Sequence, residues 1–453
     1  MANTSITIYP QYNSNQVTNI NCGTSSPRIG GTIDISSFPN LNSFTCDSND
    51  ITSFKGFANC PNLTNVSLTL NKITGNFNDI FPNFNNRLNM VSFGVRSNLM
   101  TGTIPSLSGL SNLRVFSCNE NQLTGLIPSL SGLTNFRVFG CNSNQLTGTI
   151  PSLSGLINLQ EFRCYSNQLT GTIPSLSGLT NLREFSCNEN QLTGTLPSLS
   201  GLTNLRVFNY NENQLTGTIP SLSGLTNLRE FRCYSNQLTG PIPSLSGLTN
   251  LQYFYCNSNQ LTGTIPSLSG LINLQEFRCS SNQLTGFAGG SVSNTLSNFQ
   301  AQNNQLTQSA VDTILSTFNA TTRTTGTRVL NLGGAGNSAP SYTGGVTTTS
   351  LGFNFSRTGT LVTANVNNHG HTNGNLVTIT EIPQTDFQGT FTITVTGPNQ
   401  FRYTTVTSGS ITGTGTATMR RTTNANDGFR SYQNLALVTR LGGFPWNVNI
   451  NFP

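Results

Sequence analysis

One ten-letter segment returns along this chain at a fixed interval, and this repetition limits the possible folds more than any other feature. The segment reads FSCNENQLTG from residues 116 and 185, FRCYSNQLTG from 162 and 231, and FRCSSNQLTG from 277. Eight successive steps of 23 residues separate its marker asparagines: Asn98, Asn121, Asn144, Asn167, Asn190, Asn213, Asn236, Asn259 and Asn282. Weaker copies at Asn49, Asn71 and Asn304 bring the total to twelve units. Such short units cannot bury their own apolar faces, so they must stack as a solenoid.

Each unit contains the pattern of one short strand. Phe116 and Cys118 alternate with Ser117 and Asn119, which is the period of a strand with one buried face. Glycine and proline follow the asparagine within a few residues, so the opposite side of each unit should be extended or 3₁₀-like rather than helical. We therefore expect a mainly β protein, in which about twelve strands form a parallel sheet roughly 55 Å long.

The full unit reads L-x-x-L-x-x-F-x-C-x-x-N-x-L-x-G-x-I-P-x-L-x-G and resembles the leucine-rich-repeat family. Its LTGxIP segment is similar to the plant-type class of that family, shortened by one residue. The resemblance covers residues 35–307. It implies a curved solenoid whose strands line a concave face that can hold a partner.

Stacking should place identical residues above one another in buried columns. The phenylalanine column comprises Phe44, Phe93, Phe116, Phe139, Phe162, Phe185, Phe208, Phe231, Phe254, Phe277 and Phe299, with Val66 in the remaining unit. The cysteine column comprises Cys46, Cys118, Cys141, Cys164, Cys187, Cys233, Cys256 and Cys279, and Leu68, Val95, Tyr210 or Ala301 replace the cysteine elsewhere. A position that accepts these apolar residues is typical of packing, and we expect reduced, buried thiols. Cys22 and Cys60 lie off this column.

Both ends of a solenoid need caps. We assign residues 1–34 to an N-terminal cap with short strands in SITIYP and QVTNINC, and 308–344 to a C-terminal cap. The segment QSAVDTILSTFN has helical spacing, and Ser309 with Asp312 resembles a capping box. Residues 345–422 alternate as in a small antiparallel β-domain, which we predict to be inserted in the cap. Residues 423–453 should then complete the cap as a helix and a strand.

The β-domain also has a resemblance of its own. Its NHGHTNGNLVTIT…FQGTFTITVTGPNQFRYT is similar to small β-modules of bacteriophage tail and other virion proteins. The glycine-rich tract and the final helix and strand that flank it resemble two halves of a cap on phage-encoded repeat proteins. This resemblance implies that the C-terminal part attaches the chain to a virus particle.

The sequence offers few groups for catalysis or for binding a metal. His369 and His371 are the only histidines, and their NNHGHTNG setting is typical of a turn rather than of a metal site. The GGAG at 333 lacks the lysine of a phosphate loop. Glu161 and Glu184 stack too regularly for the carboxylate pair of a glycan-cleaving tailspike. We expect no enzymatic activity, metal or cofactor.

Charge and hydropathy limit the partners. Only 8% of residues are charged, and the net charge of +6 comes almost wholly from arginines scattered along the chain. This pattern argues against nucleic acid and against an anionic membrane. No run of about 18 apolar residues predicts membrane insertion, and the first residues lack a secretion-signal pattern.

The outward positions of each strand lie six, four and two residues before the marker asparagine. In most units these positions hold residues that are neither arginine nor tyrosine, as in Val115, Ser117 and Asn119. Four units differ, with Glu161, Arg163 and Tyr165; Glu230, Arg232 and Tyr234; Glu276, Arg278 and Ser280; and Tyr253, Tyr255 and Asn257. These residues are either same-face ion pairs, each worth about 0.5 kcal/mol, or a binding patch of the residue types favoured in hot spots.

Two functions fit these observations. The first is a non-enzymatic bacteriophage virion protein, a decoration or a tail or fibre adhesin made in the host cytoplasm. Its partners would be other virion proteins, further copies of itself, and a host surface protein or glycan. The alternative is a cellular, bacterial surface-adhesion or protein-binding protein with the same repeats.

Overall fold

The computed structural model describes residues 14–23, 27–319, 328–333 and 336–337, together with the strands given below between 349 and 449. The chain divides into two compact units. The first comprises Met1–Arg323, Val329–Ser338 and Phe452–Pro453, and the second comprises Thr324–Arg328 and Ala339–Asn451. Each unit is considered by itself.

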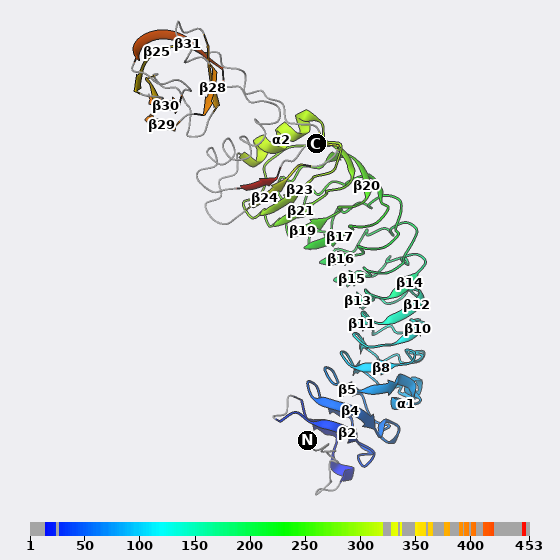
Figure 1. Ribbon diagram of the computed structural model, residues 1–453. Coiled ribbons are helices and arrows are strands. Elements are labelled where there is room, and N and C mark those ends of the chain that lie inside the picture. Colours follow the sequence, from blue (N-terminus) through cyan, green and yellow to red (C-terminus); the bar gives the residue numbers. More distant parts are fainter. Residues whose placement is uncertain are drawn as a thin grey trace. The chain divides into compact units, whose positions relative to one another are not determined.

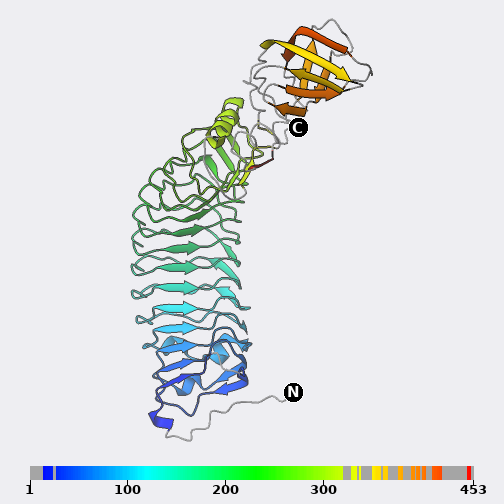
Figure 2. The ribbon, with the colours of Figure 1, turned by 90° about the vertical axis from the view of Figure 1, so that its left-hand side faces the viewer.

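One parallel sheet runs through the first unit and lines the inner side of a curved stack (Figures 1 and 2). Its strands follow chain order, and each pairs with the strand one repeat away. They are β1 (Asn19–Asn21), β3 (Ser43–Thr45), β5 (Asn65–Ser67), β7 (Ser92–Gly94), β9 (Val115–Ser117), β11 (Val138–Gly140), β13 (Glu161–Arg163), β15 (Glu184–Ser186), β16 (Val207–Asn209), β17 (Glu230–Arg232), β19 (Tyr253–Tyr255), β21 (Glu276–Arg278), β23 (Asn298–Gln300) and β24 (Arg328–Asn331). The mainly β solenoid of about twelve turns is confirmed, and the caps add β1 and β24 at its ends.

The outer side of the stack carries short, interrupted strand pairs and triplets (Figure 1). These are β2 (Gly30–Asp34) with β4 (Asp50–Lys55), β6 (Thr74–Asn76) with β8 (Leu99–Thr101), β10 (Thr124–Leu126) with β12 (Gln145–Thr149) and β14 (Gln168–Thr170), and β18 (Thr239–Pro241) with β20 (Gln260–Ile265) and β22 (Gln283–Phe287). Helical turns occur at η1 (Ser14–Gln16), η2 (Phe57–Asn59), α1 (Phe77–Ile80) and η3 (Phe84–Asn86). The four-residue α1 is the one departure from the extended or 3₁₀-like side that we expected.

The phenylalanines form the expected buried column. Phe162 pairs in register with Phe185, and their rings stack with centroids 5.4 Å apart. All eleven phenylalanines of the column have an exposed fraction of 0%, and Val66 has 2%. From Phe93 to Phe299 each ring contacts the next, so the aromatic core continues across these repeat boundaries.

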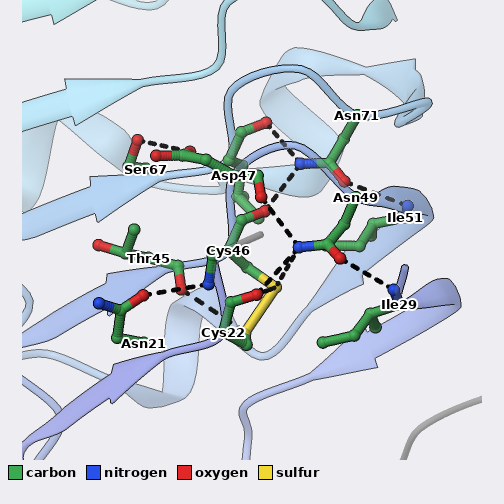
Figure 3. Close-up of a disulfide and its surroundings, with 12 residues drawn as sticks. Asn21, Cys22, Ile29, Thr45, Cys46, Asp47, Asn49, Ile51, Ser67 and Asn71 are labelled. Carbon is green, nitrogen blue, oxygen red and sulfur yellow. Dashed lines mark hydrogen bonds between the residues drawn. A yellow bond between two sulfur atoms is a disulfide. The ribbon is translucent and has the colours of Figure 1, made fainter. Parts of the chain in front are cut away.

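The cysteine column is also buried, with one correction. Seven cysteines of the column are free and fully buried: Cys118, Cys141, Cys164, Cys187, Cys233, Cys256 and Cys279. The residues that take the place of cysteine in other repeats are also fully buried: Leu68, Val95, Tyr210 and Ala301. The expectation of a reduced thiol is wrong at Cys46, which forms a disulfide with Cys22 (Figure 3). The β1–β3 pairing brings the two Cα atoms to 4.6 Å, within the range for disulfides. The bond joins the N-terminal cap to the first repeat.

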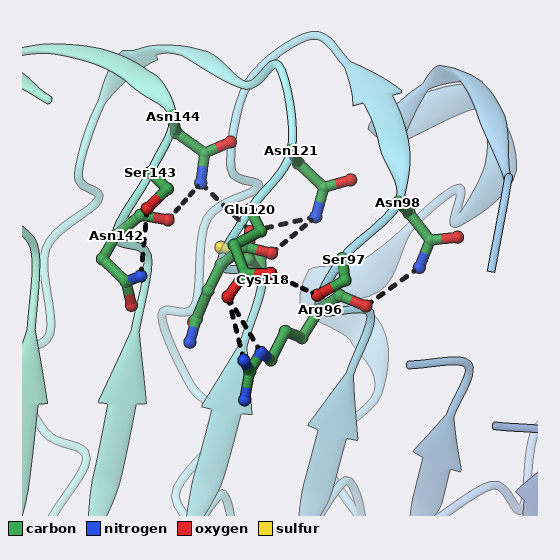
Figure 4. Close-up of polar contacts among 10 residues, drawn as sticks. Arg96, Ser97, Asn98, Cys118, Glu120, Asn121, Asn142, Ser143 and Asn144 are labelled. Carbon is green, nitrogen blue, oxygen red and sulfur yellow. Dashed lines mark hydrogen bonds and ion pairs between the residues drawn. The ribbon is translucent and has the colours of Figure 1, made fainter. Parts of the chain in front are cut away.

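The marker asparagines form a ladder of hydrogen bonds beside these columns. The side chain of Asn190 donates to the carbonyls of Cys164, Cys187 and Asn188, each at 3.1 Å. Its oxygen accepts the N–H of Leu169 at 2.9 Å. The same donor bonds recur at Asn98, Asn121 and Asn144 (Figure 4). Each asparagine therefore satisfies backbone groups of its own repeat and of the repeat before it.

A left-handed residue stands immediately before each marker asparagine. Glu189 has φ of 54°, Ser166 has 51°, and the equivalent residue is Ser or Glu in most repeats. This conformation is uncommon for residues other than glycine. The asparagine bonds hold the chain in this turn as it leaves the strand.

The C-terminal cap begins with α2 (Gln308–Asn319), in the segment for which we predicted a helix. The predicted capping box is wrong, because Ser309 lies inside the helix. The capping residue is Thr307, whose hydroxyl accepts the N–H of Ala310 at 3.2 Å. Beyond α2, Asn337 accepts the N–H of Leu306 and donates to Ala301, which extends the asparagine ladder past the twelfth repeat. The predicted SITIYP strand of the other cap lies outside the described residues.

The second unit contains an antiparallel sheet of seven strands in the order β28-β27-β31-β25-β26-β30-β29. Its strands are β25 (Thr349–Thr358), β26 (Leu361–Asn365), β27 (Leu376–Thr380), β28 (Gly389–Thr392), β29 (Thr394–Gly397), β30 (Gln400–Thr404) and β31 (Ile411–Arg420). A further strand, β32 (Trp446–Asn449), falls in the last segment, where we expected one. The helix expected before it lies outside the described residues, and the insertion of the β-domain in the cap stays a prediction.

Candidate functional site

The first group of predicted site residues lies on β13 and β15 of the inner face. Arg163 forms an ion pair with Glu161 at 2.8 Å and a second one with Glu184 on the next strand at 2.5 Å. The pKa of Arg163 is raised, mainly by its hydrogen bonds to Glu184. The guanidinium of Arg163 is therefore held in a fixed position between two carboxylates, and it is half-buried on the inner face.

The second group joins three strands through one aromatic ring. Tyr255 of β19 lies between two guanidinium groups, with the Arg232 carbon 5.2 Å and the Arg278 carbon 4.6 Å from its ring centre. Its hydroxyl donates to Glu276 at 2.8 Å, and Glu276 also pairs with Arg278 at 2.6 Å. Each cation–π contact is worth about 0.5–2 kcal/mol. We call Arg232, Tyr255 and Arg278 the arginine–tyrosine stack.

The contacts of the stack cover Tyr255 more than the sequence pattern indicated. Only 9% of this residue is exposed. Burial, together with the hydrogen bond to Glu276, raises the pKa of Tyr255. Tyr255 therefore positions the two arginines, and it offers little surface of its own to a partner.

The other predicted residues border the stack. Tyr253 is half-buried and donates its hydroxyl to Gln275 at 2.9 Å. Glu230 binds Arg232 at 3.0 Å and accepts a hydrogen bond from Asn209 on the preceding strand at 2.6 Å. Tyr234 is half-buried, and burial and Glu212 raise its pKa. Tyr165 is half-buried two residues after Arg163.

The expected pairing of Arg with the Glu two residues earlier is present at Arg163, Arg232 and Arg278. What the sequence pattern missed is the bonds that cross from one repeat to the next. Arg163 reaches Glu184, 21 residues later, and Asn209 reaches Glu230 by the same offset. The signal that could have found them is the parallel register, which places residues 23 apart side by side.

The inner carboxylates Glu161, Glu184, Glu230 and Glu276 each pair with a guanidinium. Within the described part of the chain, no group of three or more His, Cys, Asp or Glu side chains is placed to hold a metal ion. His369 and His371 lie outside the described residues. Among the helices that the structure describes, none is both long and apolar enough to span a bilayer.

Comparisons with known proteins identify the repeats. A family model described as Leucine Rich repeats (2 copies) matches residues 157–201 and 249–289. A search of curated proteins found no significant match.

Three solved structures are similar to this chain. The plant peptide hormone receptor RGFR1, in complex with RGF2, aligns at 23% identity with a TM-score of 0.51 over 65% of this chain and 60% of that chain. PEPR1 with AtPEP1 aligns at 22% identity and 0.54 over 71% and 52%. A leucine-rich-repeat protein of Leptospira interrogans aligns at 24% and 0.47 over 67% and 74%. The chain thus spans less than two thirds of either of the first two.

Proposed function

We propose that the chain is a non-enzymatic binding protein, on the basis of its leucine-rich repeats, which the family model matches at residues 157–201 and 249–289. Its partner would be a protein or peptide held on the inner face of the sheet. The observation that carries this proposal is the arginine–tyrosine stack together with the half-buried tyrosines of the same face, Tyr165, Tyr234 and Tyr253. We call these residues the patch. Tyrosine and arginine are the residue types most favoured at binding hot spots.

The contacts within the patch prepare it for binding. Arg232 and Arg278 are fixed by Tyr255 and by their own glutamates, so they lose little freedom when a partner arrives. Tyr234 and Tyr253 keep part of their rings exposed beside this fixed base. RGFR1 and PEPR1, whose fold is similar, were solved with RGF2 and AtPEP1 bound. A peptide or protein partner is the corresponding proposal for this chain.

Two tyrosines allow a test that does not disturb the fold. Tyr165 and Tyr234 occupy a position at which other repeats carry Asn119, Asn188 or Asn211. We expect the double variant Tyr165→Asn/Tyr234→Asn to fold normally and to bind its partner at least 10-fold more weakly, a change of about 1.4 kcal/mol or more. The partner is first identified by cross-linking and mass spectrometry, and its Kd is then measured by titration calorimetry.

A matched control removes polar groups from a repeat on the same face that has no arginine or tyrosine at its outward positions. Ser117→Ala/Asn119→Ala should leave the Kd within 2-fold of the original value. If the two double variants weaken binding equally, the partner does not recognise the patch. If neither does, its site lies elsewhere on the chain.

We further propose that the binding protein is a component of a bacteriophage particle. Support comes from the likeness of residues 345–422 to small virion β-modules and from the low lysine content, with Lys55 and Lys72 the only two lysines. A disulfide such as Cys22–Cys46 persists on virion surfaces as well as on cell surfaces. The β-domain and cap would then attach the chain to the particle.

A second candidate, a bacterial surface-adhesion protein, is favoured by the same disulfide, because oxidising conditions outside the cell maintain such bonds. An antibody against residues 98–282 separates the two. Electron microscopy of labelled samples should show the antibody on purified virus particles if the first proposal is right. Label on cell envelopes and on no particle would reject it in favour of the second.

A further inference from the structure

One column of side chains on the solenoid contains arginines that have no role in the site described above. It stands immediately before each inner strand, where the chain enters the sheet. Eight successive repeats carry at this position Arg114, Arg137, Gln160, Arg183, Arg206, Arg229, Gln252 and Gln275. We call the five arginines the arginine column.

The backbone places these residues directly above one another. The N–H of Arg137 donates to the carbonyl of Arg114, that of Arg206 to Arg183, and that of Arg229 to Arg206, each at 2.8 Å. Neighbouring members are therefore about 4.8 Å apart at the backbone. Three consecutive repeats, from Arg183 to Arg229, present an unbroken run of positive charge along the edge of the sheet.

The arginine column differs from the inner arginines in its partners. All five members are exposed, and none forms an ion pair within the described part of the chain. The carboxylates next to them in sequence, Glu184 and Glu230, are occupied by Arg163 and Arg232. Like charges at this spacing repel one another. An anion bound along the column would relieve this repulsion.

The charge is also polarised across the sheet. Glu189 and Glu212 lie at the turn where the chain leaves the strand, at the far end from Arg183 and Arg206. Those glutamates repel an anion from one margin while the arginines attract it to the other. The anion would therefore run along the arginine column, parallel to the solenoid axis, rather than lie across the sheet.

We infer that the arginine column binds a linear acidic polysaccharide. Each arginine of the column is preceded by an exposed asparagine two residues earlier and an exposed serine or threonine three residues earlier, as in Thr203, Asn204 and Arg206. The Asn204 amide nitrogen donates to Thr180 of the preceding repeat at 2.9 Å, and its oxygen can accept from a sugar hydroxyl. A guanidinium binds carboxylate or sulfate in a forked geometry. The repeated trio matches a polymer that carries hydroxyls between its anionic groups.

Other linear polyanions fit this margin less well. Single-stranded nucleic acid needs aromatic side chains on which bases stack, and the residues that follow the column arginines are Val115, Val138, Glu184, Val207 and Glu230. An extended acidic peptide advances about 3.3 Å per residue, which does not match a step of about 4.8 Å. This inference concerns different residues from the proposed protein-binding patch, so each can fail without the other.

The test removes the unbroken run and measures binding of the full chain to two probes. The variant is Arg183→Gln/Arg206→Gln/Arg229→Gln, which introduces the residue that Gln160, Gln252 and Gln275 already place in this column. Dextran sulfate and polygalacturonate distinguish sulfate from carboxylate as the anion. We expect binding to at least one probe, a loss of 10-fold or more in the variant, and a log K against log salt slope that is smaller by about 2–3.

The control variant Arg28→Gln/Lys72→Gln/Arg96→Gln removes the same charge from other exposed sites, where these residues pair with Asp50 and Glu120. It should change the affinity less than 2-fold. Equal losses in both triple variants would show attraction by net charge and overturn the inference. Binding to neither polysaccharide, or tighter binding to polyuridylate or to polyglutamate than to both, would also overturn it.

Discussion

Raising the pH above about 9 is expected to destabilise the solenoid steeply. Eight free cysteines are buried, and burial raises the pKa of each, to about 11 for Cys60 and about 12 for Cys233. In the unfolded chain a thiol ionises near 8.5. The unfolded state therefore loses protons that the folded state keeps, so stability is intact below about pH 8.5 and falls as the pH rises towards the folded-state values.

The expected slope is large because the thiols act together. Each one contributes up to about 1.4 kcal/mol per pH unit within this window. Urea unfolding at pH 7, 8.5 and 10, followed by circular dichroism, measures the effect. The variant Cys164→Ala/Cys187→Ala/Cys256→Ala is the control, because Ala301 already occupies the same column. Its loss of stability with pH should be shallower, and an unchanged slope would show that other groups are responsible.

Asn190→Ala should lower the free energy of unfolding by about 4 kcal/mol. The change leaves the buried N–H of Leu169 without its acceptor, which costs about 1–3 kcal/mol. It also removes three hydrogen bonds, worth about 0.5–1.5 kcal/mol each, to carbonyls that keep a second donor in Asn167, Asn213 or Ser166. The loss also removes the support for the left-handed turn at Glu189. Equilibrium urea unfolding gives the measurement, and the loss should be similar for any marker asparagine in the middle of the solenoid.

An exposed asparagine of the next repeat provides the control. Asn204 is exposed and makes one hydrogen bond, to the carbonyl of Thr180. Asn204→Ala should cost no more than about 0.5 kcal/mol, as is usual for surface changes. If the two variants lose the same stability, the buried ladder does not hold the repeats together in the way that its geometry indicates.

Much of the solenoid could be predicted because its interactions repeat. The columns headed by Phe116 and Cys118, the parallel pairing and the helix over Gln308–Asn319 all follow from spacing in the sequence. The Cys22–Cys46 disulfide could not be predicted in the same way. Cys22 lies before the first regular repeat, so the spacing that identifies the other columns does not reach it.

The candidate site was predicted only in part, for a related reason. Side chains that face the same way within one strand are visible in the sequence, and the Glu–Arg pairs were found by that rule. Contacts between repeats depend on register and on side-chain direction, so Arg163 with Glu184 and the enclosure of Tyr255 were missed. The arginine column was missed most completely. Its members read as scattered charges in the sequence, and only stacking brings them together.

The asparagine ladder has a consequence for how such a chain can change its length. Every bond of Asn190 stays within its own repeat or reaches the adjacent one. A gene that gains or loses a whole 23-residue unit therefore encodes a protein in which each remaining asparagine still meets the same partners. The ladder also accommodates the 27-residue step from Asn71 to Asn98, where Asn98 donates to the carbonyl of Leu68 and accepts the N–H of Ile73. Unequal recombination between the near-identical units would in this way yield folded proteins whose solenoids differ in length.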